Sequence, residues 1–193
     1  MSPWFGYALF VAGNVAGIII RVPHDKRSKQ VRVVEDRKGA VEKTLLALLT
    51  IALLLPLVTM TTPMLAFANY PFQPTCMALG AVSMGLYLWL FHRAHADLGD
   101  NWSFTLQVRE GHRLVTSGIY RRIRHPMYAA IYMVAVAQIL LVANWISGPA
   151  MLVAFTAMVV LRVGPEEQLM IDRFGDEYRA YAATTKRLIP GVW

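Results

Sequence analysis

The sequence predicts an all-α integral membrane protein with five transmembrane helices and a cytoplasmic amphipathic helix near the C-terminus. The chain has 193 residues, of which 56% are hydrophobic and only 16% are charged. Apolar runs of roughly the ~20 residues needed to cross a bilayer recur along it. The charged residues lie in the connections between these runs and in the segment that begins at Arg162, near the end of the last run. We therefore expect a single membrane domain that occupies residues 1–193.

Five apolar runs reach or approach the length of a membrane span. They lie at about 3–20, 44–68, 74–91, 127–145 and 147–163. The first run has no basic segment before it and no small-residue cleavage pattern after it, so we expect a retained span and not a signal peptide. The last two runs are joined only by "NWISGP". So short a connection predicts an antiparallel helical hairpin.

The charged residues fall into three segments that five spans would place on one side of the membrane. Residues 21–43, 92–126 and 162–193 hold all 19 Lys and Arg and all 12 Asp and Glu. The positive-inside rule makes that side cytoplasmic and puts the N-terminus outside. The net charge of +7 lies in loops beside apolar runs. This arrangement favours membrane lipids as partners and argues against nucleic acid.

Three features within the spans have structural interpretations. Gly13 and Gly17 form a G-x-x-x-G pattern, which is typical of a helix-packing face. Pro56 is expected to kink the second span, which neighbouring helices tolerate. Cys76 is the single cysteine, so the chain forms no internal disulfide and no thiolate metal site.

The segment after the fifth span changes character. Pro165 suits the first turn of a helix, where the acidic Glu166 and Glu167 would face the positive end of the helix dipole. An apolar stripe follows at helical spacing, formed by Met170, Phe174, Tyr178 and Tyr181. We expect an amphipathic helix at the membrane surface, either continuous or broken at Gly175.

Ionisable residues flank the predicted hairpin on its cytoplasmic side. His125 and Tyr128 open the fourth span, and Arg162 and Glu166 close the fifth. Each has a structural explanation when taken singly, such as helix capping or contact with lipid phosphates. The hairpin, however, should bring all four together, and converging ionisable groups at a membrane boundary indicate a functional site.

The run "LVTSGIYRRIRHPMYAA", followed by R-x-x-x-E-E and "FGDEYRAY", resembles the isoprenylcysteine carboxyl methyltransferase family. The resemblance covers about residues 100–190. It implies that they form the catalytic and cofactor-binding subdomain, completed by the C-terminal amphipathic helix, of a membrane enzyme that uses S-adenosylmethionine and releases S-adenosylhomocysteine. It implies that Arg162 meets the substrate carboxylate and that Glu166 shares the catalytic work. It also implies a cofactor-binding set: Gln107, His112, Arg113, Leu114, Val115, Tyr120, His125, Pro126, Met127, Tyr128 and Glu166.

The chemistry of these residue types suits that cofactor. An acid is needed for its ammonium, and either Glu166 or Glu167 qualifies. Donors are needed for its carboxylate, and His125, nearby arginines and backbone N–H groups qualify. Aromatic faces suit its sulfonium, and the candidates are Tyr120, Tyr128 and Trp102. Methyl transfer to an ionised carboxylate needs no general base, so orientation should supply most of the rate.

We therefore expect methyl transfer to the carboxylate of a lipid-embedded acceptor, a prenylated cysteine C-terminus or a similar isoprenoid acid, with a methyl ester as product and no metal. Methylation of a phospholipid amine is the alternative, with Glu167 available as its base. A nicotinamide-dependent sterol-type reductase is a second alternative. A metal site built on His92, His95, Asp97 and His112 is a third. A structural lipid-binding membrane protein is the non-enzyme alternative.

Overall fold

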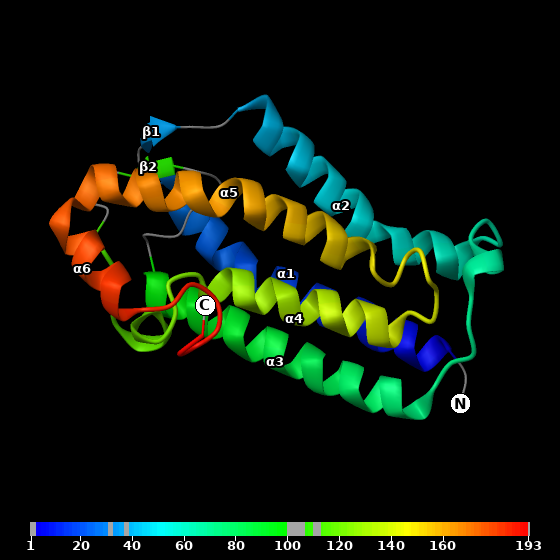
Figure 1. Ribbon diagram of the computed structural model, residues 1–193. Coiled ribbons are helices and arrows are strands. Elements are labelled where there is room, and N and C mark those ends of the chain that lie inside the picture. The colour runs from blue at the N-terminus through cyan, green and yellow to red at the C-terminus, as the bar shows by residue number, and fades with distance from the viewer. Residues whose placement is uncertain (1–2, 31–32, 37–38, 100–106, 110–112, 193) are drawn as a thin grey trace.

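The computed structural model describes residues 3–30, 33–36, 39–99, 107–109 and 113–192 (Figure 1). Helices make up most of it. They are α1 (Trp4–Gln30), α2 (Ala40–Thr61), α3 (Pro74–Leu98), α4 (Pro126–Leu141), α5 (Ala150–Phe174) and α6 (Asp176–Thr184), with short 3-10 helices η1 (Ala66–Ala68) and η3 (Gly118–Arg121). The strands are β1 (Val33–Asp36) and β2 (Gln107–Arg109), which pair antiparallel.

Three of the predicted spans form helices long and apolar enough to cross a membrane. These are residues Trp4–Ser28 in α1, Ala40–Thr61 in α2 and Pro74–Leu98 in α3. The other two predicted spans differ. Helix α4 is apolar but has only 16 residues. Helix α5 has 25 residues, and its second half carries Arg162, Glu166 and Glu167, so its apolar part is shorter than the helix.

The predicted hairpin is confirmed, because α4 and α5 pack together and run in opposite directions (Figure 1). Its turn is fixed by Asn144, whose side-chain amide donates to the Leu65 carbonyl and to the Asn69 side chain, both at 2.8 Å. The Trp145 N–H also donates to the Ala68 carbonyl at 2.9 Å. The α2–α3 and α4–α5 connections therefore meet at one end of the bundle, the end where the chain begins (Figure 1).

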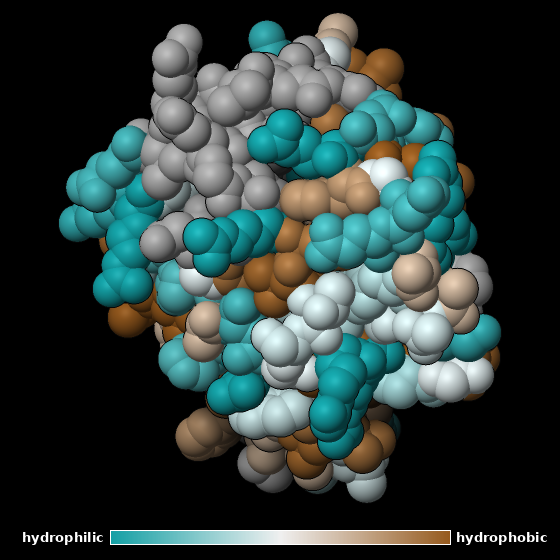
Figure 2. Space-filling view, turned by 90° about the vertical axis from the view of Figure 1, so that its left-hand side faces the viewer, coloured by the Kyte–Doolittle hydropathy of each residue, from teal (hydrophilic) through white to brown (hydrophobic). Residues whose placement is uncertain are grey.

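The opposite end carries the charged connections. The β1–β2 pair joins the α1–α2 connection to the segment that follows α3, and α6 lies at this end as well (Figure 1). Figure 2 looks onto this end, where hydrophilic side chains surround a smaller hydrophobic area. The all-α prediction is confirmed as the fold class, and the short β1–β2 pair is a detail that the sequence did not predict.

Helices α1, α3 and α4 form the main core, and α2 packs chiefly on α5. The prediction that Gly13 and Gly17 form a packing face is confirmed. A Cβ at Gly13 would collide with Met84 of α3, and one at Gly17 would collide with Tyr87. The absence of side chains here lets α1 approach α3 closely.

The prediction for Pro165 is wrong. It does not open a new helix but lies inside α5, which continues to Phe174. The helix tolerates this proline because neighbouring groups can satisfy the backbone carbonyl that it leaves unpaired. The chain breaks instead at Gly175, whose φ of 56° ends α5 and begins α6. The predicted single C-terminal amphipathic helix is therefore the charged half of α5 plus the short α6.

Candidate active site

A cavity of about 350 Å³ lies between the helices and reaches the charged end of the bundle. Its volume falls within the roughly 300–1,000 Å³ typical of small-molecule sites. At the charged end it is lined by His125, Arg162 and Glu166. Toward the opposite end its walls are mainly apolar, with side chains such as Leu49 and Val134. A ligand with one polar and one lipid-like end would match this distribution.

Most residues of the predicted cofactor set line this cavity. They are Arg113, Leu114, Val115, Tyr120, His125, Pro126, Met127, Tyr128 and Glu166. Arg162 lines it too. Gln107 lies in β2, where its backbone pairs with Asp36. His112 and Trp102 lie outside the described residues. The roles assigned to these residues stay predictions, but the structure gives most of them one common cavity.

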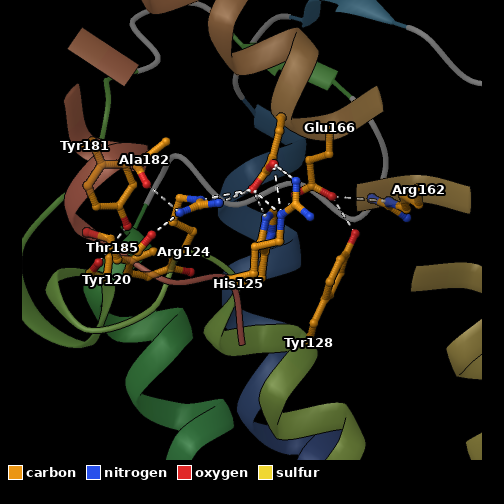
Figure 3. Close-up of polar contacts among 11 residues, drawn as sticks. Tyr120, Arg124, His125, Tyr128, Arg162, Glu166, Tyr181, Ala182 and Thr185 are labelled. Carbon is orange, nitrogen blue, oxygen red and sulfur yellow. Dashed lines mark hydrogen bonds and ion pairs between the residues drawn. The ribbon is translucent and has the colours of Figure 1, made fainter. Parts of the chain in front are cut away.

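The predicted meeting of the two hairpin ends is confirmed. The Tyr128 hydroxyl donates a hydrogen bond to Glu166 (Figure 3). The other neighbours of this carboxylate are Arg162, with Nε at 3.5 Å, and His125, with Nδ1 at 3.9 Å. The His125 ring stacks on Tyr128 with 5.3 Å between ring centroids. Glu166 keeps 30% of its side chain exposed, so it can still meet a ligand cation.

Glu167 points into a different and more enclosed cluster. Arg124 donates to it from Nε at 2.9 Å and from Nη2 at 2.8 Å, and Arg187 donates from Nη2 at 2.6 Å. His125 Nε2 lies 3.3 Å from the same carboxylate. Arg124 also donates to the carbonyls of Ala182 and Thr185 (Figure 3). This cluster joins the start of α4 to α5 and to the C-terminal segment.

The cluster sets the charge state of Glu167. Burial alone would raise the pKa of this carboxyl, but hydrogen bonds from His125, Arg187 and Arg124 outweigh burial and hold the pKa well below its usual range. The same contact raises the pKa of Arg187. Glu167 is therefore ionised and already surrounded by donors. Of the two acids left open by the sequence, Glu166 is the one available to a ligand.

Two tyrosines close the cavity beside η3 and α6. Burial raises the pKa of Tyr120 above its usual range and that of Tyr181 to about 12. Both phenols therefore remain neutral near pH 7. The Tyr181 hydroxyl donates to the Tyr120 carbonyl at 2.6 Å. These rings can offer aromatic faces to a ligand, but they do not act as bases.

Sequence reasoning missed several residues of this region. Glu42, in the first turn of α2, lies 3.2 Å from Arg162 Nη1. Arg124 and Arg187 hold Glu167, and Arg21 of α1 lines the cavity. The one signal in the sequence was that ionisable residues sit at the ends of apolar runs. That pattern does not predict which of these ionisable residues contact one another.

The structure offers little to the metal alternative. Among the described residues, no three His, Cys, Asp or Glu side chains gather closely enough to hold a metal ion. His95 is fully buried, donates from Nδ1 to the Phe91 carbonyl at 2.8 Å, and has its ring 5.1 Å from that of His24. His112 lies outside the described residues.

Comparison with known proteins matches the region that builds this site. Residues 79–172 fit the model of the isoprenylcysteine carboxyl methyltransferase family. The protein-S-isoprenylcysteine O-methyltransferase of Schizosaccharomyces pombe is 30% identical over 115 residues, which are 58% of this chain and 48% of that protein. The enzyme of the same name from Dictyostelium discoideum is 32% identical over 119 residues, 61% of this chain and 47% of that protein.

A third relative, protein-S-isoprenylcysteine O-methyltransferase B of Arabidopsis thaliana, is 30% identical over 96 residues, 49% of each chain. The chain thus spans about half the length of the relatives that it matches. The family match begins in α3 and covers η3, α4 and nearly all of α5. Those elements carry Tyr128, Arg162 and Glu166. Over residues 79–172, the stretch that carries most of the candidate site, the chain is therefore similar to the isoprenylcysteine carboxyl methyltransferase family.

Proposed function

We propose that this protein transfers the methyl group of S-adenosylmethionine to the carboxylate of a lipid-embedded acceptor, a prenylated cysteine C-terminus, to form a methyl ester. One observation carries the proposal: a single cavity has Arg162 and Glu166 at its charged end and apolar helix surfaces beyond them. The names of the relatives supply the class of acceptor. The cavity is suited to that acceptor because it offers a cation beside a lipid-like wall.

The residues at the charged end fit the cofactor. Glu166 is partly exposed and is held by Tyr128, so it can accept hydrogen bonds from an ammonium group. Tyr120 and Tyr128 place aromatic rings along the same cavity, where they can face a sulfonium. When bound, S-adenosylmethionine supplies a methyl group activated by a positively charged sulfur. The protein's residues bind and orient the cofactor and the acceptor, and they exclude water from the site.

Arg162 suits the acceptor carboxylate. Its side chain is only 10% exposed and lies one helical turn before Glu166, so both face the same cavity. The planar guanidinium fixes the plane of a carboxylate through paired N–H donors. An ionised carboxylate needs no base, which agrees with neutral Tyr120 and with a Glu167 already surrounded by donors. Orientation in a site with little water should then supply most of the rate.

A lipid acceptor also explains the apolar wall. Leu46, Leu49 and Leu53 of α2 line the cavity opposite Ile131 and Val134 of α4. Each buried CH₂ of a prenyl chain contributes about 0.8 kcal/mol to partitioning into such surroundings. The prenyl chain would be held among the helices while the carboxylate projects toward Arg162.

We also propose the finer topology. The hairpin of α4 and the first half of α5 would complete the bilayer crossings begun by α1, α2 and α3, giving five. The N-terminus would then lie outside and the charged end, with the active site, in the cytoplasm. This is supported by the segregation of all Lys and Arg residues into three segments. It is further supported by both uncharged connections lying at the end where the chain begins.

The function is tested by methyl transfer from radiolabelled S-adenosylmethionine to a panel of acceptors in detergent. A farnesyl- or geranylgeranyl-cysteine should be methylated. Arg162→Ala should abolish this activity while binding of S-adenosylhomocysteine stays nearly unchanged. Arg162→Lys should recover little, because a point charge does not reproduce the planar fork. Faster turnover on an ethanolamine phospholipid than on any carboxylate would overturn the proposal.

A further inference from the structure

Glu42 places a carboxylate of the protein itself against the guanidinium of Arg162. It belongs to the first turn of α2, and its Oε1 lies 3.2 Å from Arg162 Nη1. Both side chains are buried, with 9% of Glu42 and 10% of Arg162 exposed. Helix α2 precedes the segment that matches the family model. Glu42 is thus a partner that this chain brings to Arg162 from outside that segment.

The two carboxylates beside Arg162 are held differently. Glu166 lies 3.5 Å from Arg162 Nε and also receives the Tyr128 hydroxyl, with His125 close by. Glu42 has the ion pair with Arg162, but neither of its oxygens accepts a hydrogen bond from the described residues. A buried carboxylate with so few donors is poorly compensated. Of the two carboxylates, Glu42 would lose fewer interactions on moving away from Arg162.

An incoming acceptor would add a third carboxylate to this site. Three negative groups around one buried guanidinium repel one another, so one of them must move away or take up a proton. Glu166 is fixed by other partners. Glu42 lies at the N-terminus of a helix, where the backbone N–H groups and the helix dipole stabilise a negative charge away from Arg162. Movement of Glu42 is therefore the simplest way to admit the acceptor.

We propose that Glu42 is an intramolecular competitor that occupies the acceptor-carboxylate position on Arg162 until a substrate displaces it. This inference rests on the proposed function. It makes Glu42 a specificity-determining residue. A lipid without an anionic group cannot replace Glu42 on Arg162, whereas a prenylated cysteine can replace it with the same chemical group. Arg162 therefore never faces the apolar cavity without a negative partner.

The test is equilibrium binding of two farnesylcysteine ligands in the presence of S-adenosylhomocysteine, one with a free carboxylate and one with a neutral carboxamide. Glu42→Gln keeps the shape of the side chain and removes its charge. The variant should bind the carboxylate ligand more tightly, with a Kd lower by about three- to tenfold, because the binding-competent fraction is no longer reduced by competition. The Kd of the carboxamide should stay unchanged. In turnover, the same change should appear in KM and not as a loss of kcat.

Glu177→Gln is the matched control, because Glu177 is also a first-turn carboxylate but is exposed on α6; it should alter neither Kd. Glu42→Asp, which keeps the charge on a shorter side chain, should give an intermediate result and serves if the glutamine variant does not fold. Weaker or unchanged carboxylate binding in both Glu42 variants would overturn the inference. If the wild-type protein neither binds nor methylates any prenylcysteine, the proposed function itself is wrong and the inference fails with it.

Discussion

Tyr128 and Glu166, 38 positions apart in the chain, are joined by a hydrogen bond from the phenol to the carboxylate. This contact ties the first turn of α4 to the charged half of α5. It also holds Glu166 at the cavity wall, where the carboxylate remains partly exposed. The longer contacts from Arg162 and His125 add to this hydrogen bond in placing the proposed cofactor ligand.

Tyr128→Phe should weaken cofactor binding while leaving the fold in place. The ring and its stacking on His125 remain, but the donor to a charged group is lost, which costs about 1.5–3 kcal/mol. The expected result is an increase of about tenfold or more in the Kd of S-adenosylhomocysteine, measured by calorimetry in detergent. Tyr132→Phe is the control, because Tyr132 is also on α4 and packs its ring on Phe155. Equal binding by both variants would contradict the assignment of Glu166.

Glu167→Gln should destabilise the protein strongly. The substitution leaves Arg124, whose side chain is 10% exposed, without the carboxylate that compensates it. Removing one partner of a buried ion pair typically costs about 3–5 kcal/mol. A large drop in melting temperature in detergent is expected. The exposed Glu177→Gln should change stability by less than about 0.5 kcal/mol, and a comparable loss in both variants would argue against a special role for Glu167.

The free energy of unfolding should fall on acidification, because Glu167 then becomes protonated. The pKa of Glu167 is depressed in the folded state, so its contribution is complete above the ordinary glutamate pKa of about 4.3. That contribution is lost as the pH falls below this value toward the folded-state pKa. Thermal melts between about pH 7 and pH 3 should therefore show a steeper loss for the wild type than for Glu167→Gln. Parallel curves would show that other groups cause the acid sensitivity.

Gly118→Ala should disturb the turn that carries Tyr120. Gly118 has a φ of 60°, and a Cβ there would collide with the Asp97 carboxylate. Asp97 also accepts the Ile119 N–H at 2.8 Å, so the collision would break this anchor. We expect a loss of about 1–2 kcal/mol from backbone strain alone. In contrast, Gly85→Ala on α3 meets no atom within 4 Å and should be neutral or stabilising. The two melting temperatures provide the comparison.

The proposed orientation is tested with topology reporters. A reporter inserted after Tyr70, in the uncharged α2–α3 connection, should lie outside, and one at the C-terminus should lie in the cytoplasm. The reason is that an odd number of crossings separates these two positions. A reporter within residues 37–39 serves as a control and should agree with the C-terminal one. If Tyr70 and the C-terminus report the same side, the count of five crossings is wrong.

The sequence was informative where one pattern determines one element. Alternating apolar runs and charged connections predicted the order of the long helices, and the short link before Pro149 predicted the hairpin that brings Tyr128 to Glu166. Some helix ends were predicted wrongly because a proline does not always end an α-helix. Helix α5, for example, continues through Pro165. The pairing of β1 with β2 was missed because the partners are far apart in the chain.

The partners of the site acids could not be predicted in the same way. Glu166 and Glu167 are neighbours in the sequence, yet one faces the cavity and the other faces Arg124 and Arg187. Only the path of the C-terminal segment distinguishes them. Glu42 was missed for a similar reason, because the packing of α2 on α5 decides that it meets Arg162.

Two backbone hydrogen bonds have a consequence for biosynthesis. The Arg124 N–H donates to the Lys186 carbonyl, and the His125 N–H donates to the Arg187 carbonyl. Proteins are made from the N-terminus, so all the long helices leave the ribosome before the segment that braces His125. Glu167 is synthesised 20 residues ahead of Arg187 and meets this partner only after α6 has formed. The candidate cavity is therefore completed only after the long helices and α6 have been made. A nascent chain already inserted in the membrane would complete the proposed site only when the segment around Arg187 docks against His125 and Glu167.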